Sequence, residues 1–402
     1  MDLFLKDIGD VSNESRQYVQ KRKIVSLLNK SDAPLTIPEV CQKVRLSVPT
    51  GTRLINELID DKIIVECGKR ETENGRRPSL YQVDTSYAYS VGVVVVLKGL
   101  SLSIFNLGME EVFSAENEDF VLENTEECLT EVTAFIQQSI EESGIAEKNI
   151  LGMGMGITGR VNSKAGLSYN YFNFLDGSLT GYLMTRFSFP VYIDNDTHLL
   201  GLAEQVFGRA KNEKNAFVVN LSHGLGMAMI TNGEIVLGDD GFAGEFGHMQ
   251  IVDSQRLCFC GKRGCLGTEV SGHALEEIFK EQIEAGETSL LAAKATRKVN
   301  FKMILDAAQE GDVLSISLAH NLGFRLGKAL GNILNLLNPH VIIIGGKFAQ
   351  AKEILFDSIK SGMMHSALSL PLRSCELKFS SVGKEAAIKG AGALTLKKMN
   401  LI

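Results

Sequence analysis

The sequence predicts an α/β protein whose body has two similar lobes and whose N-terminal part is a winged helix-turn-helix domain. Two short helices joined by a tight link occur near the N-terminus and are followed by two short strands. Farther along the chain, a group of strands followed by helices occurs twice. The chain has 402 residues, which is enough for two or three domains.

The composition is that of a globular protein, with 45% apolar and 22% charged residues. No apolar run reaches the ~18 residues that a membrane span needs. The N-terminus also lacks the basic-then-apolar order of a secretory signal. Clustered cysteines without a disulfide framework fit a reducing compartment. We therefore expect a cytoplasmic protein that does not contact a membrane.

The charge is distributed unevenly along the chain. Residues 1–85 contain 14 Lys and Arg against 13 Asp and Glu, a net charge of +1, whereas the whole chain carries −7. The remaining residues therefore carry −8. This balance does not by itself indicate nucleic-acid binding, but it leaves room for a small basic face in the first 85 residues. Sequence motifs have to decide the question.

Three helices are expected within the first 60 residues. Residues 15–29 are amphipathic, with apolar side chains on one side. Thr36 and Glu39 have the spacing of a capping box, which begins a second helix that runs to about residue 43. Ser47 is the expected N-cap of a third helix that extends to about residue 60. Helix, three-residue turn and helix form the helix-turn-helix unit, whose second helix lies in the DNA major groove.

A wing is expected after these helices. Residues 63–66 and 80–83 predict its two strands, and the loop between them carries two arginines between Gly75 and Pro78. Arginines on such a loop are suited to a narrow minor groove. The helices alone also fit a plain three-helix core, and the wing favours DNA binding. The residues expected to contact DNA are Ser47, Thr50, Thr52, Arg53, Asn56, Arg76 and Arg77.

The body alternates strands and helices in two similar halves. The first half is expected to contain strands at 89–97, 101–105 and near 112, a helix at 126–143 and a strand at 150–156. The second half is expected to contain strands at 216–221, 226–231, 234–237 and 341–344, with helices over most of 270–337.

The glycines at 152, 154 and 156 have the spacing of a dinucleotide-binding turn, but no helix directly follows them, so we reject that interpretation. Two lobes imply a cleft, where small molecules usually bind.

One imidazole and three thiols lie within residues 248–265, with the spacing His-x9-Cys-x-Cys-x4-Cys. Gly261 and Gly264 let the backbone fold back so that the sulfur atoms can converge. Zinc prefers four tetrahedral nitrogen and sulfur ligands, and a site filled by four protein ligands is structural. The alternative is a loop of reduced, unliganded thiols. We expect a structural Zn²⁺ bound by His248, Cys258, Cys260 and Cys265.

Taken together, these stretches resemble the ROK family of repressors, open reading frames and sugar kinases over nearly the whole chain. The resemblance is carried by residues 243–248, 258–265 and 338–346, and by Asn195 with Asp196. The N-terminal part is similar to that of the repressor branch, which includes xylose, glucose and N-acetylglucosamine regulators. The resemblance implies an actin-like, hexokinase-like pair of lobes. It divides the chain into a winged domain at 1–85, a first lobe at 86–198 with 387–402, and a second lobe at 199–386.

The resemblance also implies a sugar site, in which carboxylates, an amide and an imidazole bind sugar hydroxyls. Gly267 stands where family members carry a sugar-binding Glu. Either Glu269 substitutes for that residue, or the pocket has lost one carboxylate and the effector is unusual, phosphorylated or absent. His198 stands where Asn is common, and we expect a histidine that is at the surface or internally hydrogen-bonded. The implied sugar-binding residues are Asn195, Asp196, Glu245, His248 and Glu269.

The turn that binds ATP phosphate in the kinase members is degenerate here. Those members open the body with Asp-x-Gly-Gly-Thr, but Val94 stands at the Asp position and Val96 and Leu97 replace the glycines. Side chains with a Cβ block the close backbone approach that glycine permits. The second phosphate turn, at 222–226, is half retained. We expect that kinase activity has been lost and that Asp196 is a vestigial base.

These observations favour a sugar-responsive transcriptional regulator, acting as a repressor on operator DNA. Two alternatives stay open: a ROK sugar kinase with a DNA-binding head, and a regulator controlled by a protein partner. A homodimer or a dimer of dimers is expected, because helix-turn-helix proteins read paired half-sites.

Overall fold

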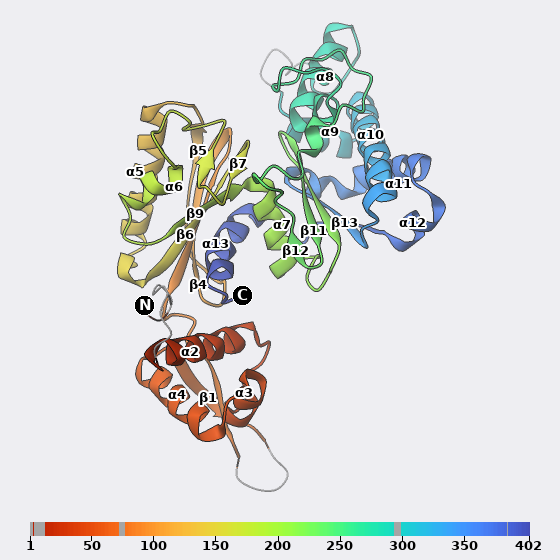
Figure 1. Cartoon of the computed structure of the whole chain (residues 1–402). Helices are drawn as coiled ribbons and strands as arrows, with labels where there is room; N and C mark the ends of the chain where they lie inside the picture. The colour runs from red at the N-terminus through yellow and green to blue at the C-terminus, as the bar shows by residue number, and fades with distance from the viewer. Residues whose placement is uncertain (1–2, 4–12, 72–76, 293–298, 384) are drawn as a thin grey trace. The chain divides into compact units, whose positions relative to one another are not determined.

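The computed structural model describes residues 3, 13–71, 77–292, 299–383 and 385–402. It divides into two compact units, Met1–Leu199 with Ile388–Ile402 and Leu200–Ala387 (Figure 1). Each unit contains a five-stranded mixed sheet and helices, which confirms the predicted α/β class. The three-part division of the sequence stays a prediction. In the described part of the chain, no helix is long and apolar enough to cross a membrane.

The N-terminal part of the first unit contains the expected helices and strands. They are α2 (Asn13–Lys30), α3 (Ile37–Val44), α4 (Val48–Asp60), β1 (Ile64–Lys69) and β2 (Ser79–Val83) (Figure 1). The predicted capping box begins α3, where the Glu39 carboxylate accepts the Thr36 backbone N–H at 2.9 Å. The predicted N-cap begins α4, where the Ser47 hydroxyl accepts the Thr50 N–H at 3.4 Å. β1 and β2 pair in antiparallel orientation, as the wing prediction requires.

A small apolar core holds these helices together. Leu54, Ile55 and Leu58 of α4 are buried in one cluster with Ile24 of α2. The Asn29 side chain at the end of α2 donates to the carbonyls of Leu107 and Leu401 at 3.3 and 3.2 Å. These bonds attach α2 to the α/β part of the same unit.

The first unit's sheet has the strand order β5-β4-β3-β6-β9. β3, β4 and β5 form an antiparallel meander, and β6 and β9 continue from β3 in parallel. The strands are β3 (Tyr89–Val95), β4 (Lys98–Asn106), β5 (Glu111–Val121), β6 (Ile150–Ile157) and β9 (Val191–Asn195). The helices of this part are α5 (Glu126–Glu142), α6 (Leu179–Met184) and the greater part of α13 (Ala386–Lys398).

Gly154 of β6 is explained by the helix α13, which packs on this strand. A Cβ atom built on Gly154 would lie 2.0 Å from the carbonyl oxygen of Ala391 in α13. On the neighbouring strand β3, a Cβ on Gly92 would lie 2.5 Å from the carbonyl oxygen of Ile388. Gly154, the central glycine of the Gly-x-Gly-x-Gly run, therefore permits close packing between β6 and α13. A loop and the short strand β7 (Val161–Asn162) follow β6, in agreement with our rejection of a dinucleotide-binding turn.

The second unit repeats the topology of the first. Its strand order is β12-β11-β10-β13-β14, again an antiparallel meander followed by two parallel strands. The strands are β10 (Ala216–Leu221), β11 (Leu225–Thr231), β12 (Glu234–Ile235), β13 (Val341–Gly345) and β14 (Glu376–Phe379). β12 ends two residues before the predicted end. The helices are most of α7 (Asp196–Phe207), with α8 (Gly272–Glu284), α9 (Phe301–Gln309), α10 (Val313–Leu337), α11 (Lys352–Ser366) and α12 (Ser369–Ser374).

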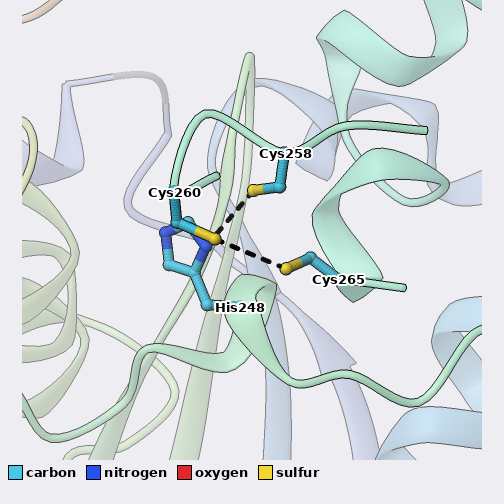
Figure 2. A group of neighbouring side chains, drawn as sticks. All are labelled: His248, Cys258, Cys260 and Cys265. Carbon is cyan, nitrogen blue, oxygen red and sulfur yellow. Dashed lines mark hydrogen bonds between the residues drawn. The ribbon is translucent and has the colours of Figure 1, made fainter. Parts of the chain in front are cut away.

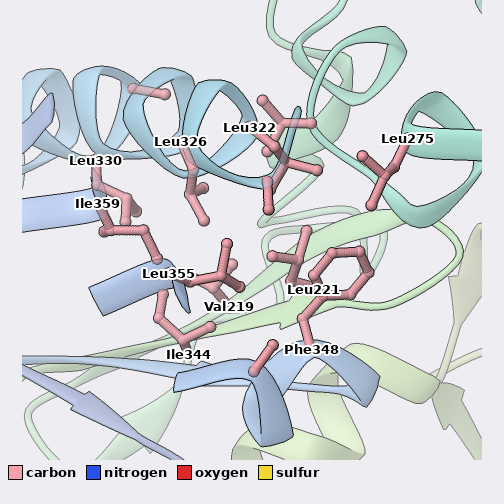
Figure 3. Packing of buried hydrophobic residues seen from close by; sticks show 14 of the residues in the cluster. Val219, Leu221, Leu275, Leu322, Leu326, Leu330, Ile344, Phe348, Leu355 and Ile359 are labelled. Carbon is pink, nitrogen blue, oxygen red and sulfur yellow. The ribbon is translucent and has the colours of Figure 1, made fainter. Parts of the chain in front are cut away.

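The core of the second unit lies between the sheet and the long helix α10 (Figure 3). Leu322, Leu326 and Leu330 are spaced four residues apart, so they share one face of α10. This face packs over Val219 of β10 and Ile344 of β13, which are both fully buried. The core thereby fixes the ends of β10 and β13 and the loops that leave the sheet.

Candidate functional site

Four candidate metal ligands lie together in the second unit (Figure 2). The ligand atoms of His248, Cys258, Cys260 and Cys265 all lie within 4.8 Å of one another. His248 Nδ1 is 3.4 Å from Cys258 Sγ, and Cys260 Sγ is 3.6 Å from Cys265 Sγ. Tetrahedral zinc with bonds of ~2.0–2.3 Å needs ligand atoms roughly 3.3–3.8 Å apart. These four residues, which we call the His–Cys cluster, could therefore hold a metal ion, and their donor set is compatible with zinc.

Two glycines and several backbone bonds position the cysteines. Gly261 and Gly264 have φ values of 82° and 76°, in the region that favours glycine. The Cys258 N–H donates to the Lys262 carbonyl at 2.8 Å and closes a tight turn. The Ile251 N–H donates to the Gly264 carbonyl at 3.1 Å and holds the two sides of the loop together. The positive φ angles confirm the predicted role of both glycines.

The thiols of Cys260 and Cys265 differ in pKa. Burial raises the pKa of the Cys265 thiol to about 12, and hydrogen bonds with the neighbouring thiols act in the same direction. Burial also favours the protonated form of Cys260, but the Lys262 backbone N–H and the neighbouring thiols bring its pKa below the usual value. Metal ligands are thiolates, so a bound cation would have to displace the Cys265 proton.

The His248 ring connects the thiols to a carboxylate. Nδ1 faces Cys258, and Nε2 lies 3.7 Å from Oε2 of Glu245. A carboxylate at the second nitrogen of a metal-bound imidazole fixes its orientation and tautomer. The Glu245 and His248 side chains are 40% and 45% exposed, whereas Phe246 between them is buried in the core. The pair is therefore both anchored and accessible to a polar ligand.

Asn195 and Asp196 lie in the first unit, where β9 ends and α7 begins. The Asn195 amide oxygen accepts the Thr197 backbone N–H at 2.8 Å, and its amide nitrogen donates to the Gly159 carbonyl at 2.7 Å. These two bonds fix the amide, and Asp196 occupies the first position of the helix. The predicted sugar-binding residues are thus divided between the units, because Glu245, His248 and Glu269 belong to the second.

His198 is a satisfied histidine, as predicted. It is 3% exposed, and its Nδ1 lies 2.8 Å from Oδ1 of Asp194. The same Asp194 oxygen accepts the Asn195 backbone N–H at 2.8 Å. The histidine therefore supports the strand end that carries Asn195.

Glu269 is held by an ion-pair network that sequence reasoning missed. Its carboxylate accepts the Ser254 hydroxyl at 2.6 Å and lies 3.4 Å from Arg256 Nε, and it also pairs with Arg325. The Glu269 side chain is 10% exposed. A sugar could bind this carboxylate only by breaking these contacts. No local spacing reveals the network, because Arg325 lies 56 residues away in the sequence.

Gly267 lies beside the turn that carries His248. A Cβ atom built on Gly267 would be 3.2 Å from the carbonyl oxygen of Gly247. A side chain at this position would therefore start next to the turn that carries Glu245 and His248. Glu269 lies two residues farther along, and its oxygens are turned to the arginines.

The degenerate phosphate turn is part of a strand hairpin. Val94 lies in β3 and pairs with Ser101 of β4. The Val96 N–H donates to the Gly99 carbonyl at 3.1 Å, and the Leu97 carbonyl accepts the Leu122 N–H at 3.2 Å. The backbone of these residues is engaged in sheet and turn bonds.

The predicted DNA-contacting residues that the structure describes lie at the N-cap and in the first three turns of α4, and Arg77 lies two residues before β2. Ser47, Arg53 and Asn56 are exposed, and Thr50 and Thr52 are half-buried. The Thr50 and Ser47 hydroxyls are 2.8 Å apart, and Arg53 pairs with Glu57 one turn later on α4. Arg77 is exposed, and Arg76 lies outside the described residues.

An ion pair links α3 to the wing. Arg70, directly after β1, lies 2.6 Å from Oε1 of Glu39. The hydrogen bonds from Arg70 and from the Thr36 backbone hold the pKa of the Glu39 carboxyl at about 2. The wing is therefore attached to the helix-turn-helix unit by a charged contact.

Most of the chain is similar in sequence to proteins of a known family. Residues 107–398 match the ROK family. The chain is 27% identical over 383 residues to the xylose repressor of Bacillus spizizenii, with 94% of each protein covered. It is 30% identical over 260 residues to a glucokinase of Halalkalibacterium halodurans, which covers 63% of this chain and 79% of the glucokinase.

A solved structure agrees with these sequence matches. A ROK family transcriptional regulator, a homolog of the E. coli MLC protein, has a TM-score of 0.81 and 26% identity to this chain. The comparison covers 95% of this chain and 97% of the regulator. The family match includes both five-stranded sheets except for β3 and β4, and it includes the four candidate metal ligands His248, Cys258, Cys260 and Cys265. The chain therefore belongs to the ROK family, and its body has the hexokinase- and actin-like α/β fold that the resemblance implied.

Proposed function

We propose that this chain is a sugar-responsive transcriptional regulator that represses genes by binding operator DNA. The observation that carries the proposal is a helix-turn-helix unit with a wing hairpin on the same chain as a ROK body. The xylose repressor relative supports it, because the two proteins align over 94% of both chains. Ser47 at the N-cap and Arg53 and Asn56 in the second and third turns of α4 are exposed, and the N-terminal part of a recognition helix contacts base edges.

The residues proposed as sugar contacts are Asn195 and Asp196, where β9 ends and α7 begins, and Glu245 and His248, at the turn before the cysteines of the His–Cys cluster. Their amide, carboxylate and imidazole groups can donate to and accept from sugar hydroxyls. For Glu269 we propose the alternative in which the pocket has lost one carboxylate. The reason is that its oxygens are held by Ser254, Arg256 and Arg325.

We further propose that Zn²⁺ binds His248, Cys258, Cys260 and Cys265 and has a structural role. Four nitrogen and sulfur donors leave no open coordination position, so the ion would not activate water. The three thiolates and the imidazole would hold the loop at residues 258–265 against the turn at 246–248. Glu245 would then keep its position at the second nitrogen of His248.

A sugar kinase is the second candidate, and the glucokinase relative and Asp196 favour it. Phosphoryl transfer depends on positioning and charge neutralisation. Val94, Val96 and Leu97 offer neither a metal-binding carboxylate nor a glycine turn, and their backbone is engaged in a hairpin. We therefore propose a regulator without kinase activity.

DNA binding can be tested by selecting duplexes from a random pool with the full chain and titrating the enriched duplex by fluorescence anisotropy. Arg77→Ala should weaken binding to all duplexes and reduce the magnitude of the salt slope by about 1, because one positive charge at the minor groove is lost. Arg186→Ala is the matched control, since this exposed arginine stacks on Tyr182 at 3.7 Å in the α/β part. Failure to enrich any duplex would refute the DNA-binding proposal.

The sugar response is tested with D-xylose, D-glucose, N-acetylglucosamine and their phosphates. One of these should change DNA affinity by about 5–150-fold, the usual range of coupling between two sites. Asp196→Asn and Glu245→Gln should reduce this response and leave sugar-free DNA affinity unchanged. DNA binding that no sugar changes would favour control by a protein partner. Turnover of ATP with a hexose at about 1 s⁻¹ or faster would contradict the absence of kinase activity.

A further inference from the structure

A second group of metal-type side chains lies in the same unit as the His–Cys cluster. His223, His273 and Glu276 each offer one ligand atom, and these atoms all lie within 4.8 Å of one another. The two imidazole rings are stacked with centroids 5.3 Å apart and an interplanar angle of 27°. All three residues are half-buried. We propose that they form a second metal site, which takes a divalent transition-metal ion such as Zn²⁺, Co²⁺ or Ni²⁺.

The backbone places the two histidines together. His223 lies in the turn between β10 and β11, and His273 is the second residue of α8. The His273 N–H donates to the His223 carbonyl at 3.0 Å, and the Gly272 N–H donates to the Ser222 carbonyl at 2.8 Å. The turn and the start of the helix are therefore joined by two main-chain bonds. These two bonds fix the backbone of both histidines, and the side-chain rotamers then set the distance between the imidazoles.

The third ligand comes from the same helix as His273. Residues three apart on an α-helix are neighbours on one face, so Glu276 lies beside His273. The Glu276 Oε1 atom accepts the backbone N–H of Phe301 at 2.9 Å. A carboxylate has about four acceptor positions, so it can keep this bond and also bind a cation. Hydrogen bonds of this kind orient metal ligands and strengthen their sites.

The donor set defines the chemistry of the site. Two imidazoles and one carboxylate suit zinc and the neighbouring first-row ions, and three protein ligands leave a coordination position for water or an exogenous ligand. This set contains no thiolate, which separates it chemically from the His–Cys cluster. The aromatic ring of Phe259, between two of the cluster's cysteines, lies 5.4 Å from the His273 ring. The two metal sites would therefore lie on neighbouring parts of the second unit.

The experiment is a calorimetric titration of the full chain, purified with its His–Cys site filled, with Zn²⁺ and separately with Ni²⁺. We expect one additional equivalent to bind, and His273→Ala and Glu276→Gln to weaken this binding by about tenfold or more. His320→Ala is the matched control, because this histidine is exposed on α10. Circular dichroism establishes that each variant is folded. If His273→Ala does not fold, His223→Ala and Glu276→Gln decide the question.

The absorption spectrum of bound Co²⁺ distinguishes the two metal sites. Co²⁺ added to the zinc-loaded protein should give ligand-field bands without the thiolate charge-transfer band that a cysteine site produces. His273→Ala should remove those bands, and His320→Ala should keep them. The proposal is overturned if the wild-type chain binds no additional equivalent, or if the folded variants of all three ligands bind it as tightly as the wild type does.

Discussion

The Arg70 guanidinium lies 2.6 Å from Oε1 of Glu39, and this ion pair joins the wing to the first helix of the helix-turn-helix unit. The other Glu39 oxygen accepts the backbone N–H and the hydroxyl of Thr36 at the start of α3. One carboxylate therefore closes the capping box and also holds the base of the wing. Protonation of Glu39 would weaken both of these contacts.

Glu39→Gln should therefore destabilise α3 at neutral pH. The folded-state pKa is about 2, below the ordinary value of 4.5, so the charged form stabilises the folded state. This contribution is fully present above pH 4.5 and is lost as the pH falls toward 2. Hydrogen exchange at the α3 amides, measured between pH 7 and pH 3, should show a difference between wild type and variant that shrinks with acidity. A pH-independent difference would contradict the assignment, and Glu66→Gln, an exposed site on β1, is the control.

Removal of one thiol should release the metal from the His–Cys cluster. Cys260→Ser should lower the bound zinc by one equivalent per chain and decrease the melting temperature, because binding of the ion stabilises the folded state. Cys67→Ser, an exposed thiol on β1, should retain the metal and the melting temperature. Zinc content is measured by atomic spectrometry after gel filtration. Full metal content in folded Cys260→Ser would show that the ligand set is wrong.

Gly154→Ala should destabilise the first unit strongly. The new Cβ would lie 2.0 Å from the Ala391 carbonyl oxygen, and a main-chain atom cannot move aside as a flexible side chain can. Overpacked sites typically cost about 1–3 kcal/mol, and we expect about 3 kcal/mol or more here. Gly224→Ala is the control, since its Cβ would meet open space among the described residues. Urea unfolding followed by circular dichroism measures the difference, and equal stabilities would contradict the packing between β6 and α13.

The sequence predicted those features whose signals are local. The capping box of Thr36 and Glu39, the N-cap at Ser47 and the His–Cys spacing each occupy a short segment. The spacing of these residues therefore predicted their geometry without knowledge of the tertiary structure. The strand meanders were recognisable for the same reason, because their strands follow one another closely in the sequence. The structure shows that the two meanders share one topology.

The features that sequence reasoning missed depend on contacts between distant segments. Glu269 and Arg325 are 56 residues apart, and His223 and His273 come from a turn and a helix separated by 50 positions. The role of Gly154 depends on Ala391, which lies in the last helix of the chain. No periodicity or spacing encodes these pairs, because they form only when the sheets and helices have packed.

An exposed apolar patch at the end of α10 is the dimer interface that we predict. Leu336, Met364, Leu368 and Leu370 are 63–75% exposed. The Asn335 side chain joins the segments that carry them, since it donates to the Ser366 carbonyl at 2.9 Å and accepts the Leu368 N–H at 2.8 Å. Exposed apolar patches mark interaction sites, and a self-complementary patch forms a two-fold dimer. Two wings that read paired half-sites need such a dimer.

Replacing Leu368 and Leu370 together by Glu should therefore weaken self-association. Burial of one leucine contributes about 1.5–3 kcal/mol, so losing two should raise the dimer Kd by about 100-fold or more. Light scattering over a concentration series measures the mass, and DNA affinity should fall in parallel because the half-sites are then bound singly. Leu290→Glu is the control, because this leucine is 64% exposed on a loop away from the patch. An unchanged dimer mass in the double variant would place the interface elsewhere on the chain.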